Sequence, residues 1–392
     1  MARKKWKIAA TDKAQAIALA KHCGIDPFIA IILMARGYNT PEEIKKFFSG
    51  DEHLASPLEL KDMDKAVERI QRAVDEFEKI IIYGDYDADG ITSTALLYSY
   101  LNSIGADVSY YIPEREEGYG LNIKAIDKIK DQGVSLIITV DNGIVASDEI
   151  EYALSFGIET VVTDHHLPSE TLPNAKAVVD PYRNDCLSQF KGLAGVGVAY
   201  KLVCALEGCS CDELLDEYAD LVAIGTIADV MPMCDENRIF VRGGINLIQN
   251  STRMGISALL SAAGIKTADI DSENISYYIA PRINAASRMG NASRAVKLLL
   301  SENEGEAMQL AEELCSDNTS RRQSEGEVSA DAVRQIEEKK LYMDRVLVVC
   351  GAGWPQGVVG IVASRIMEKY GLPVIIFSSE NGEASGSGRS IK

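Results

Sequence analysis

Short apolar runs alternate with helix-like segments through the middle of the chain, beginning at Lys79. The runs are rich in β-branched residues, which favour strands. In order, the alternating segments read KIIIY, ITSTALLYSYLNSIG, DVSYYI, NIKAIDKIKDQG, SLIITV, ASDEIEYALSFG and IETVVT. Strands that alternate with helices in this way predict βαβ units. We therefore expect an α/β fold whose parallel sheet is covered by helices on both faces.

The regions on either side of this pattern differ from it. The N-terminal region looks helical, and Thr40 as N-cap with Glu43 as capping-box partner predicts the start of one helix. A charged stretch with few aromatic residues, Ser301 to Lys340, predicts a long connecting helix. A second α/β pattern follows it. We expect four parts: an N-terminal helical cap (1–77), the main α/β domain (78–235), a helical connector (236–344) and a second, incomplete α/β domain (345–392).

Charge and cysteine content narrow the class of protein. The chain has 40 Lys and Arg against 58 Asp and Glu, a net charge of −18, which argues against non-specific coating of nucleic acid but permits a local basic groove. Its eight cysteines lack paired C-x-x-C spacing, so they indicate neither a disulfide framework nor a zinc ribbon. No segment approaches the roughly 20 apolar residues of a membrane span. These features predict a cytoplasmic protein that does not contact a membrane.

Ionisable residues follow three of the predicted strands. In an open α/β sheet, ligands bind beyond the carboxyl ends of the strands, so these side chains should face one crevice. Any single aspartate could instead cap the helix that follows it. Caps do not explain the whole set, because so many converging carboxylates would repel one another unless a cation held them. The residues are Asp85, Asp87, Asp89, Asp141, Asp164, His165 and His166.

The choice of residue types indicates which cation the crevice would hold. The stretch DYDADG matches the first half of an EF-hand loop, but the twelfth position is Leu96 and the stretch follows a strand rather than a helix. Two of only four histidines in the chain, His165 and His166, are adjacent at a strand end. Mixed Asp and His ligation suits Mn²⁺, with Mg²⁺ possible and Zn²⁺ less suitable. Carboxylates shared between sites suggest two ions acting on a phosphoryl centre.

Several motifs together resemble a known family. YGDYDADGITS, VDNGI, TDHH and IADVMP resemble, in order and spacing, the four motifs of the DHH phosphoesterases. More closely, APRINAASRMGNA, GVVGIVASR and GSGRS resemble the RecJ-type single-strand-specific exonucleases of bacteria. The resemblance covers essentially the whole chain. It implies a DHH domain followed by a DHHA1 domain, and release of 5′-mononucleotides from single-stranded DNA in the 5′ to 3′ direction with Mn²⁺ or Mg²⁺, in DNA repair and recombination.

The resemblance also implies roles for individual residues. It makes Asp141 the bridge between two ions and places His166 near the scissile phosphate. Asp164 would orient a ligand histidine, as metal-bound imidazoles usually require. Asp229, in IADVMP, could otherwise simply end a helix, and the family motif alone makes it a ligand. The implied metal ligands are Asp85, Asp87, Asp89, Asp141, His165 and Asp229, and the implied catalytic residues are Asp141, Asp164 and His166.

Substrate contacts are expected in the two C-terminal motifs. Arginines match phosphate oxygens, and small residues let backbone N–H groups approach a phosphate. The alternatives without a substrate contact are a solvated helix face for the first motif and an ordinary turn for the second. The expected contacts are Arg282, Asn284, Arg288, Ser387 and Arg389. Two positions depart from the family pattern: Pro355 stands where a histidine is common, and Ser287 where a glycine is usual.

The chain ends where the family continues, and two alternative functions also stay open. The sequence stops at Lys392, immediately after GSGRS, where the family continues, so we expect a C-terminally truncated relative. A DHH phosphodiesterase for short oligonucleotides or cyclic dinucleotides is one alternative, and a non-catalytic replication scaffold is another. By resemblance, the expected partners are single-stranded DNA, a single-stranded-DNA-binding protein and a helicase.

Overall fold

The computed structural model describes residues 7–49, 53–118, 120–250, 253–380 and 382–391, which form two compact units. The first unit ends at His53 and the second begins at Leu54. In the described residues no single helix is long and apolar enough to cross a membrane, although one bent pair, Lys13–Cys23 with Pro27–Ala35, passes that test of length and composition together.

Three short helices build the first unit: α1 (Lys13–Cys23), α2 (Pro27–Ala35) and α3 (Pro41–Ser49). The expected capping box at the start of α3 is confirmed. The backbone N–H of Glu43 donates to Thr40 Oγ1 at 3.2 Å, and the N–H of Thr40 donates to Glu43 Oε2 at 2.9 Å. These two hydrogen bonds satisfy N–H groups that have no partner within the helix.

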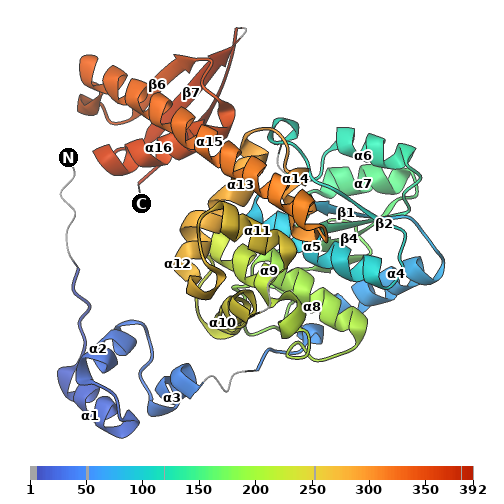
Figure 1. Cartoon of the computed structure of the whole chain (residues 1–392), viewed down its shortest axis with the longest axis horizontal. Helices are drawn as coiled ribbons and strands as arrows, with labels where there is room; N and C mark the ends of the chain where they lie inside the picture. The colour runs from blue at the N-terminus through green and yellow to red at the C-terminus, as the bar shows by residue number, and fades with distance from the viewer. Residues whose placement is uncertain (1–6, 50–52, 119, 251–252, 381, 392) are drawn as a thin grey trace. The chain divides into compact units, whose positions relative to one another are not determined.

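A five-stranded parallel sheet organises the second unit (Figure 1). Its order is β2-β1-β3-β4-β5, with β1 paired to both β2 and β3. The expected α/β class with a parallel sheet is confirmed. The strands are β1 (Ile80–Gly84), β2 (Val108–Tyr111), β3 (Leu136–Val140), β4 (Glu159–Thr163) and β5 (Ala177–Val179).

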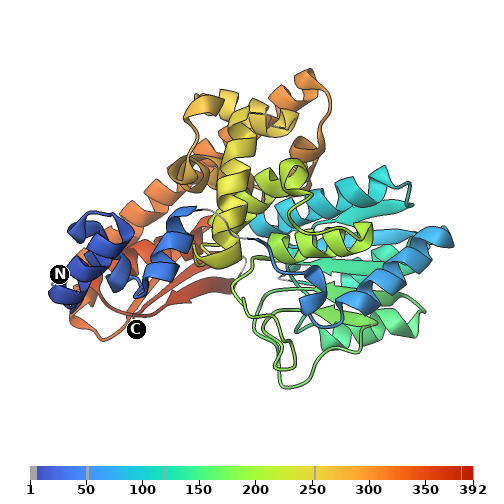
Figure 2. The ribbon, with the colours of Figure 1, turned by 90° about the horizontal axis from the view of Figure 1, so that it is seen from below.

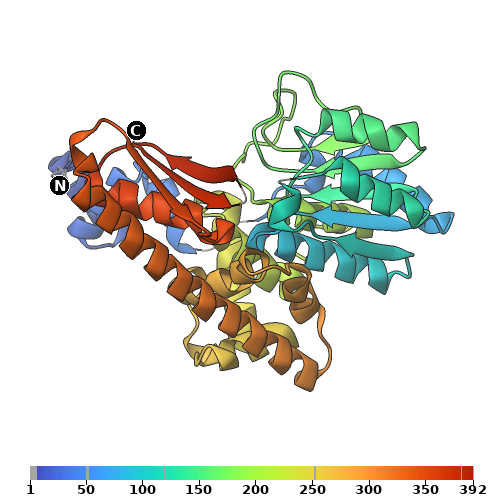
Figure 3. The same ribbon diagram turned by 90° about the horizontal axis from the view of Figure 1, so that it is seen from above.

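Helices cover both faces of this sheet, and the side-chain alternation of β1 shows why (Figures 2 and 3). Ile80 and Ile82 point to one face and join a large core, whereas Ile81 and Tyr83 point to the other face and join a smaller core. The large core is covered by α4 (Met63–Asp75), α5 (Ala88–Ser103), α8 (Gly195–Glu207) and α9 (Leu215–Ala228). The smaller core is covered by α6 (Ile123–Asp131) and α7 (Ser147–Ser155).

Further helices extend the large core. The expected long helix is present as α15, which runs for 35 residues. Just before α13, the chain forms a π-helical turn, η4, and Pro281 lies at the start of α13. These elements are α10 (Asp235–Asn250), α11 (Met254–Ala262), α12 (Ser272–Asn274), η4 (Ile275–Ile279), α13 (Ala280–Arg288), α14 (Ser293–Leu300) and α15 (Glu304–Glu338). Short 3₁₀ turns are η1 (Pro57–Glu59), η2 (Arg115–Glu117), η3 (Thr267–Asp269) and η5 (Leu341–Met343).

A second sheet closes the described chain. It consists of β6 (Leu347–Ala352), β7 (Val374–Glu380) and β8 (Glu383–Arg389), with α16 (Gln356–Tyr370) between the first two strands. Strands β6 and β7 are parallel and β8 is antiparallel to β7. Figure 3 shows α15 running up to this sheet, and apolar residues of α15, α16, β6 and β7 share one core.

The boundaries between the parts differ from those expected. The first compact unit stops at His53, not at residue 77, because Met63, Ala66 and Ile70 of α4 are buried in the core beside the sheet. Helices α10, α11, α13 and α14, with the first part of α15, bury apolar residues in the same core as α5 and α9, whereas the later part of α15 joins the core of the second sheet. The amphipathic pattern of α4 gave no indication of which surface it covers.

Candidate metal centre and arginine cleft

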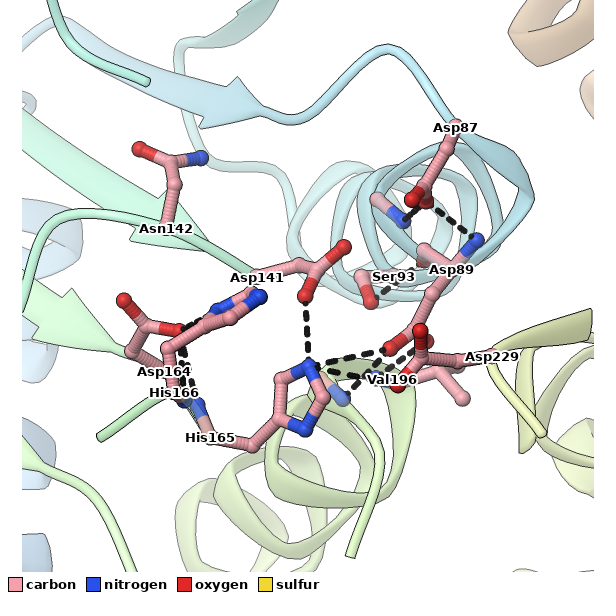
Figure 4. Close-up of polar contacts among 12 residues, drawn as sticks. Asp87, Asp89, Ser93, Asp141, Asn142, Asp164, His165, His166, Val196 and Asp229 are labelled. Carbon is pink, nitrogen blue, oxygen red and sulfur yellow. Dashed lines mark hydrogen bonds and ion pairs between the residues drawn. The ribbon is translucent and has the colours of Figure 1, made fainter. Parts of the chain in front are cut away.

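The side chains expected to bind metal meet at the carboxyl edge of the first sheet. Figure 4 labels all of them except Asp85. Asp85 directly follows β1 and Asp141 directly follows β3, while Asp164 directly follows β4. Parallel strands end at the same edge, so residues distant in sequence come together there. Asp87 caps α5, and Asp229 follows the last residue of α9.

Three overlapping groups of ligand atoms form the centre. In each group the atoms lie within 4.8 Å of one another. Asp141 and His165 each belong to two groups, so they connect the three into one cluster. The groups are Asp85, Asp87 and Asp141; Asp89, His165 and Asp229; and Asp141, His165 and His166.

The ring of His165 points into the centre of the cluster (Figure 4). Its Nε2 lies 3.0 Å from Asp141 Oδ1 and 3.7 Å from the nearest oxygens of both Asp89 and Asp229. Burial lowers the pKa of His165 to about 4, so the imidazole is neutral at neutral pH. A neutral imidazole presents a lone pair, as metal ligation requires.

The acidic atoms around His165 suit a cation. Among the described residues, Asp85 Oδ1, Asp141 Oδ1 and His165 Nε2 are buried without a hydrogen-bond partner. Burial and then repulsion from Asp87 raise the pKa of Asp85 to about 7 and that of Asp229 to about 6. Burial and neighbouring carboxylates also raise the pKa of Asp141. Buried acceptors facing one another are unfavourable unless a proton or a metal ion lies between them, so the donor set fits divalent ions.

Asp89 is held by the start of α8. Its Oδ2 accepts from Gly195 N–H at 2.7 Å and its Oδ1 from Val196 N–H at 2.9 Å. The N-terminus of a helix favours a negative charge, so α8 helps to offset the burial of this carboxylate. A Cβ on Gly195 would lie 2.6 Å from Asp141 Cβ, and one on Gly225 would lie 2.7 Å from Asp89 Oδ1. These glycines, which the sequence reasoning missed, leave room for the carboxylates.

Asp164 holds His166 rather than the ring of the expected ligand His165. Its Oδ1 lies 2.7 Å from His166 Nδ1 and also accepts from the backbone N–H of His165, while Oδ2 accepts from Ile144 N–H. The hydrogen bond to Asp164 raises the pKa of His166 to about 9. Although burial opposes it, bonding to His166 lowers the pKa of Asp164. The His166 side chain is 45% exposed, so a cationic imidazole lies open to solvent beside the cluster.

A second site lies between α13 and the C-terminal sheet. It is a cleft of about 450 Å³, and three of the five expected substrate contacts, Arg288, Ser387 and Arg389, line it. Arg115, which sequence reasoning missed, is a third arginine of the lining. We call this site the arginine cleft. Arg115 follows β2, whose carboxyl end belongs to the same sheet edge as the metal cluster, and that position was the signal that could have identified it.

Arg115 connects the cleft to the metal cluster. Its guanidinium carbon lies 4.2 Å from the ring centre of Tyr86, which stands between Asp85 and Asp87 in the chain. Its Nε donates to Ser287 Oγ at 3.3 Å. Ser287, the departure from the family's glycine, therefore contacts a cleft arginine. Pro355, the other departure, immediately precedes α16.

The other two expected substrate contacts point elsewhere. Arg282 donates to the backbone oxygen of Tyr278 at 2.8 Å and to Cys315 Sγ at 3.2 Å, and it does not line the cleft. Tyr278 belongs to η4, the π-helical turn that precedes α13. Asn284 Oδ1 accepts from the backbone N–H of Ala88, at the start of α5.

Comparisons with known proteins agree with this architecture. Residues 79–226 match the model of the DHH family, N-terminal domain. The single-stranded-DNA-specific exonuclease RecJ of Bacillus subtilis (strain 168) is 41% identical over 99% of this chain and 49% of its own length. The protein of the same name from Escherichia coli (strain K12) is 39% identical over 94% of this chain and 66% of its own length. The chain thus spans about half to two thirds of these relatives.

A solved structure extends the likeness to three dimensions. The crystal structure of exonuclease RecJ bound to manganese is 36% identical, with a TM-score of 0.77, over 86% of this chain and 84% of that one. Sequence identity at this level, together with coverage of most of both chains, goes beyond a shared fold. The chain belongs to the RecJ exonuclease family.

Proposed function

We propose that this chain is a metal-dependent exonuclease that removes 5′-mononucleotides from single-stranded DNA in the 5′ to 3′ direction. The observation that carries the proposal is the cluster of Asp and His ligand atoms, all within 4.8 Å of one another in each group, beside an arginine-lined cleft. The names of the relatives, which are single-stranded-DNA-specific exonucleases, support the same reading.

We propose that Asp85, Asp87, Asp89, Asp141, His165 and Asp229 would hold two ions, Mn²⁺ or Mg²⁺, and that Asp141, which belongs to two of the ligand groups, would be shared by both. When bound, such ions activate the attacking oxygen and neutralise charge on the phosphate that is hydrolysed. Asp164 keeps His166 cationic and oriented. His166 then supplies a proton to the 3′-oxygen that leaves when the first phosphodiester bond breaks.

The arginine cleft is proposed to hold the terminal phosphate of the strand. Arg115, Arg288 and Arg389 provide positive charge on a chain that is acidic overall, and Arg389 is oriented by hydrogen bonds to Ser364 and Ser387. Hydrolysis that releases a 5′-mononucleotide leaves a new 5′-phosphate on the shortened strand. The group that the cleft binds is therefore regenerated at each cycle, which suits an enzyme that starts at a 5′ end.

The direct test is digestion of one strand with a labelled 5′-phosphate, as a single strand and as a blunt duplex, with Mn²⁺ and with excess chelator. We expect 5′-mononucleotides from the single strand alone, only with metal, and none from the Asp141→Asn variant. Faster hydrolysis of dinucleotides or cyclic dinucleotides than of the long strand would favour the small-substrate phosphodiesterase instead. No hydrolysis, and no rise in melting temperature with Mn²⁺, would favour the scaffold.

Because the chain spans only part of its relatives, the same assay should be run beside the full-length Bacillus subtilis relative.

We also propose that the chain works in the cytoplasm, and that a helicase and a single-stranded-DNA-binding protein provide its substrate. The reason is chemical: a single-strand nuclease needs an unwound strand, and unwound strands are coated. Adding either protein should raise the digestion rate of a partial duplex, and no change with either would remove this part of the proposal.

A further inference from the structure

One hydrogen bond joins α13 to the metal cluster. Asn284 Oδ1 accepts from the backbone N–H of Ala88 at 2.8 Å, across 196 positions of sequence. Ala88 lies between Asp87 and Asp89 and is the first residue of α5. Asn284 therefore contacts the backbone at the centre of the segment that carries three of the proposed ligands. We call residues 85–90 the metal loop.

The start of α5 explains what this bond does. The first N–H groups of a helix have no partner within the helix. Asp87 accepts from two of them, those of Asp89 and Gly90, at 2.9 and 3.2 Å. The N–H of Ala88 is left over, and Asn284 is the residue that satisfies it. All three N–H groups at this turn therefore have an acceptor.

The metal loop is packed too closely to shift one residue at a time. A Cβ on Gly90 would lie 2.5 to 2.7 Å from backbone atoms of Asp85, so the two ends of the loop touch. A rotation at Ala88 would therefore move the carboxylates of Asp87 and Asp89 together. Metal binding tolerates only small shifts of these carboxylates, because ligand bonds to these ions are about 2.0 to 2.6 Å long.

We propose that Asn284 is a positioning residue for the metal loop, which fixes the Ala88 N–H so that Asp87 and Asp89 face the ions. The proposal rests on the proposed metal site. It replaces the direct substrate contact that the sequence resemblance implied for Asn284. On the same helix, α13, the side chain of Arg288 donates through Nη1 to the backbone oxygen of Gly357 at 2.7 Å. The geometry of the metal loop thus depends on a helix that also lines the arginine cleft and contacts α16.

The test measures Mn²⁺ binding by calorimetry in the absence of DNA. Asn284→Ala removes the acceptor, and we expect Mn²⁺ affinity to fall about 10- to 100-fold, as for the loss of other groups that orient metal ligands. Asn284→Asp keeps an acceptor oxygen in the same place and should bind Mn²⁺ at least as tightly as the natural chain. Asn291→Ala is the matched control, because Asn291 is exposed just after the same helix, and it should change nothing.

Each outcome decides a different point. Unchanged Mn²⁺ affinity in Asn284→Ala, with a raised KM for single-stranded DNA, would overturn the proposal in favour of a substrate contact. A weakened Asn284→Asp variant that remains folded by circular dichroism would also overturn it, and this result can be read even where Asn284→Ala fails to fold. Failure of the natural chain to bind Mn²⁺ would refute the metal site itself, and the positioning role with it.

Discussion

The metal cluster and the arginine cleft lie next to each other but are built in different ways. Most of the cluster follows strands of one parallel sheet, and Asp85, Asp89 and Asp141 are almost completely buried. The cleft is assembled from four separated segments, those of Arg115, Arg288, α16 and β8, and Arg389 is exposed. Most ligands of the cluster are placed by one sheet, with α5, α9 and the Asn284 contact from α13 completing it, whereas the cleft depends on how α13 packs against the C-terminal part.

This difference has an energetic consequence. Buried carboxylates that face one another are unfavourable without a cation, whereas partly exposed arginines are screened by solvent. Changes in the cluster should therefore abolish chemistry, and changes in the cleft should weaken binding in a graded, salt-dependent way.

The largest effect is expected from Asp141→Asn. Asp141 has a φ of +62°, a left-handed conformation that Asn adopts more readily than Ala, so Asn removes the charge with the least backbone strain. We expect kcat to fall by more than the roughly 100-fold that marks the loss of a ligand-orienting group. The metal-free melting temperature should be no lower than that of the natural chain, because the substitution removes a carboxylate that its neighbours repel. Single-turnover digestion and thermal unfolding measure the two quantities. Digestion at the natural rate would refute the role of Asp141.

The cluster could be predicted from the sequence because most of its residues directly follow segments that are recognisable as strands. The aspartates and histidines follow apolar runs that could be recognised as strands, and parallel strands bring their carboxyl ends to one edge. All six expected ligands, from Asp85 to Asp229, belong to the groups that the structure brings together. Asp229 needed the family motif, because it follows a helix and only tertiary packing brings α9 to the sheet edge.

A smaller but still large effect is expected from Gly195→Ala. The added Cβ would lie 2.6 Å from Asp141 Cβ, at the helix start that also donates to Asp89. We expect Mn²⁺ affinity to fall about 10- to 100-fold because both carboxylates must move. Gly197→Ala is a matched control on the same helix, since the three atoms nearest to its Cβ would be side-chain atoms of Leu193 at 3.3 to 3.9 Å. Equal Mn²⁺ binding by the two variants would contradict the steric argument.

The cleft was only partly predictable, for physical reasons. Arg115 lies in a short 3₁₀ turn without a recognisable motif, and only the packing of α13 brings it near Arg288. Arg282 matched the family motif, yet its guanidinium donates to the backbone oxygen of Tyr278 and to Cys315 Sγ. Asn284 also matched the family motif, but its Oδ1 already accepts a hydrogen bond from the backbone N–H of Ala88. Contacts between distant segments leave no periodic pattern in a sequence.

Arg389→Ala should separate the cleft from the cluster. Hydrogen bonds to charged groups contribute about 1.5 to 3 kcal/mol, so we expect KM for 5′-phosphorylated single strands to rise about tenfold or more, with Mn²⁺ affinity unchanged. The increase should shrink for strands with a 5′-hydroxyl, because they lack the group that the cleft is proposed to bind. Steady-state kinetics on the two strands measure this. Equal increases on both strands would show that Arg389 does not recognise the terminal phosphate.

The smallest effect is expected from Ser287→Ala, which tests how firmly the cleft is held. Ser287 is buried, and its Oγ accepts from Arg115 Nε at 3.3 Å and donates to the backbone oxygen of Asn284 at 3.1 Å. Alanine suits the interior of α13 and removes only the hydroxyl. One neutral acceptor contributes about 0.5 to 1.5 kcal/mol, so KM should rise about 2- to 10-fold with kcat and melting temperature nearly constant.

In the Arg115→Ala background the same substitution should have no further effect, because the two residues act as a pair. Additive losses in the double variant would mean that Ser287 supports the cleft through Asn284 rather than through Arg115.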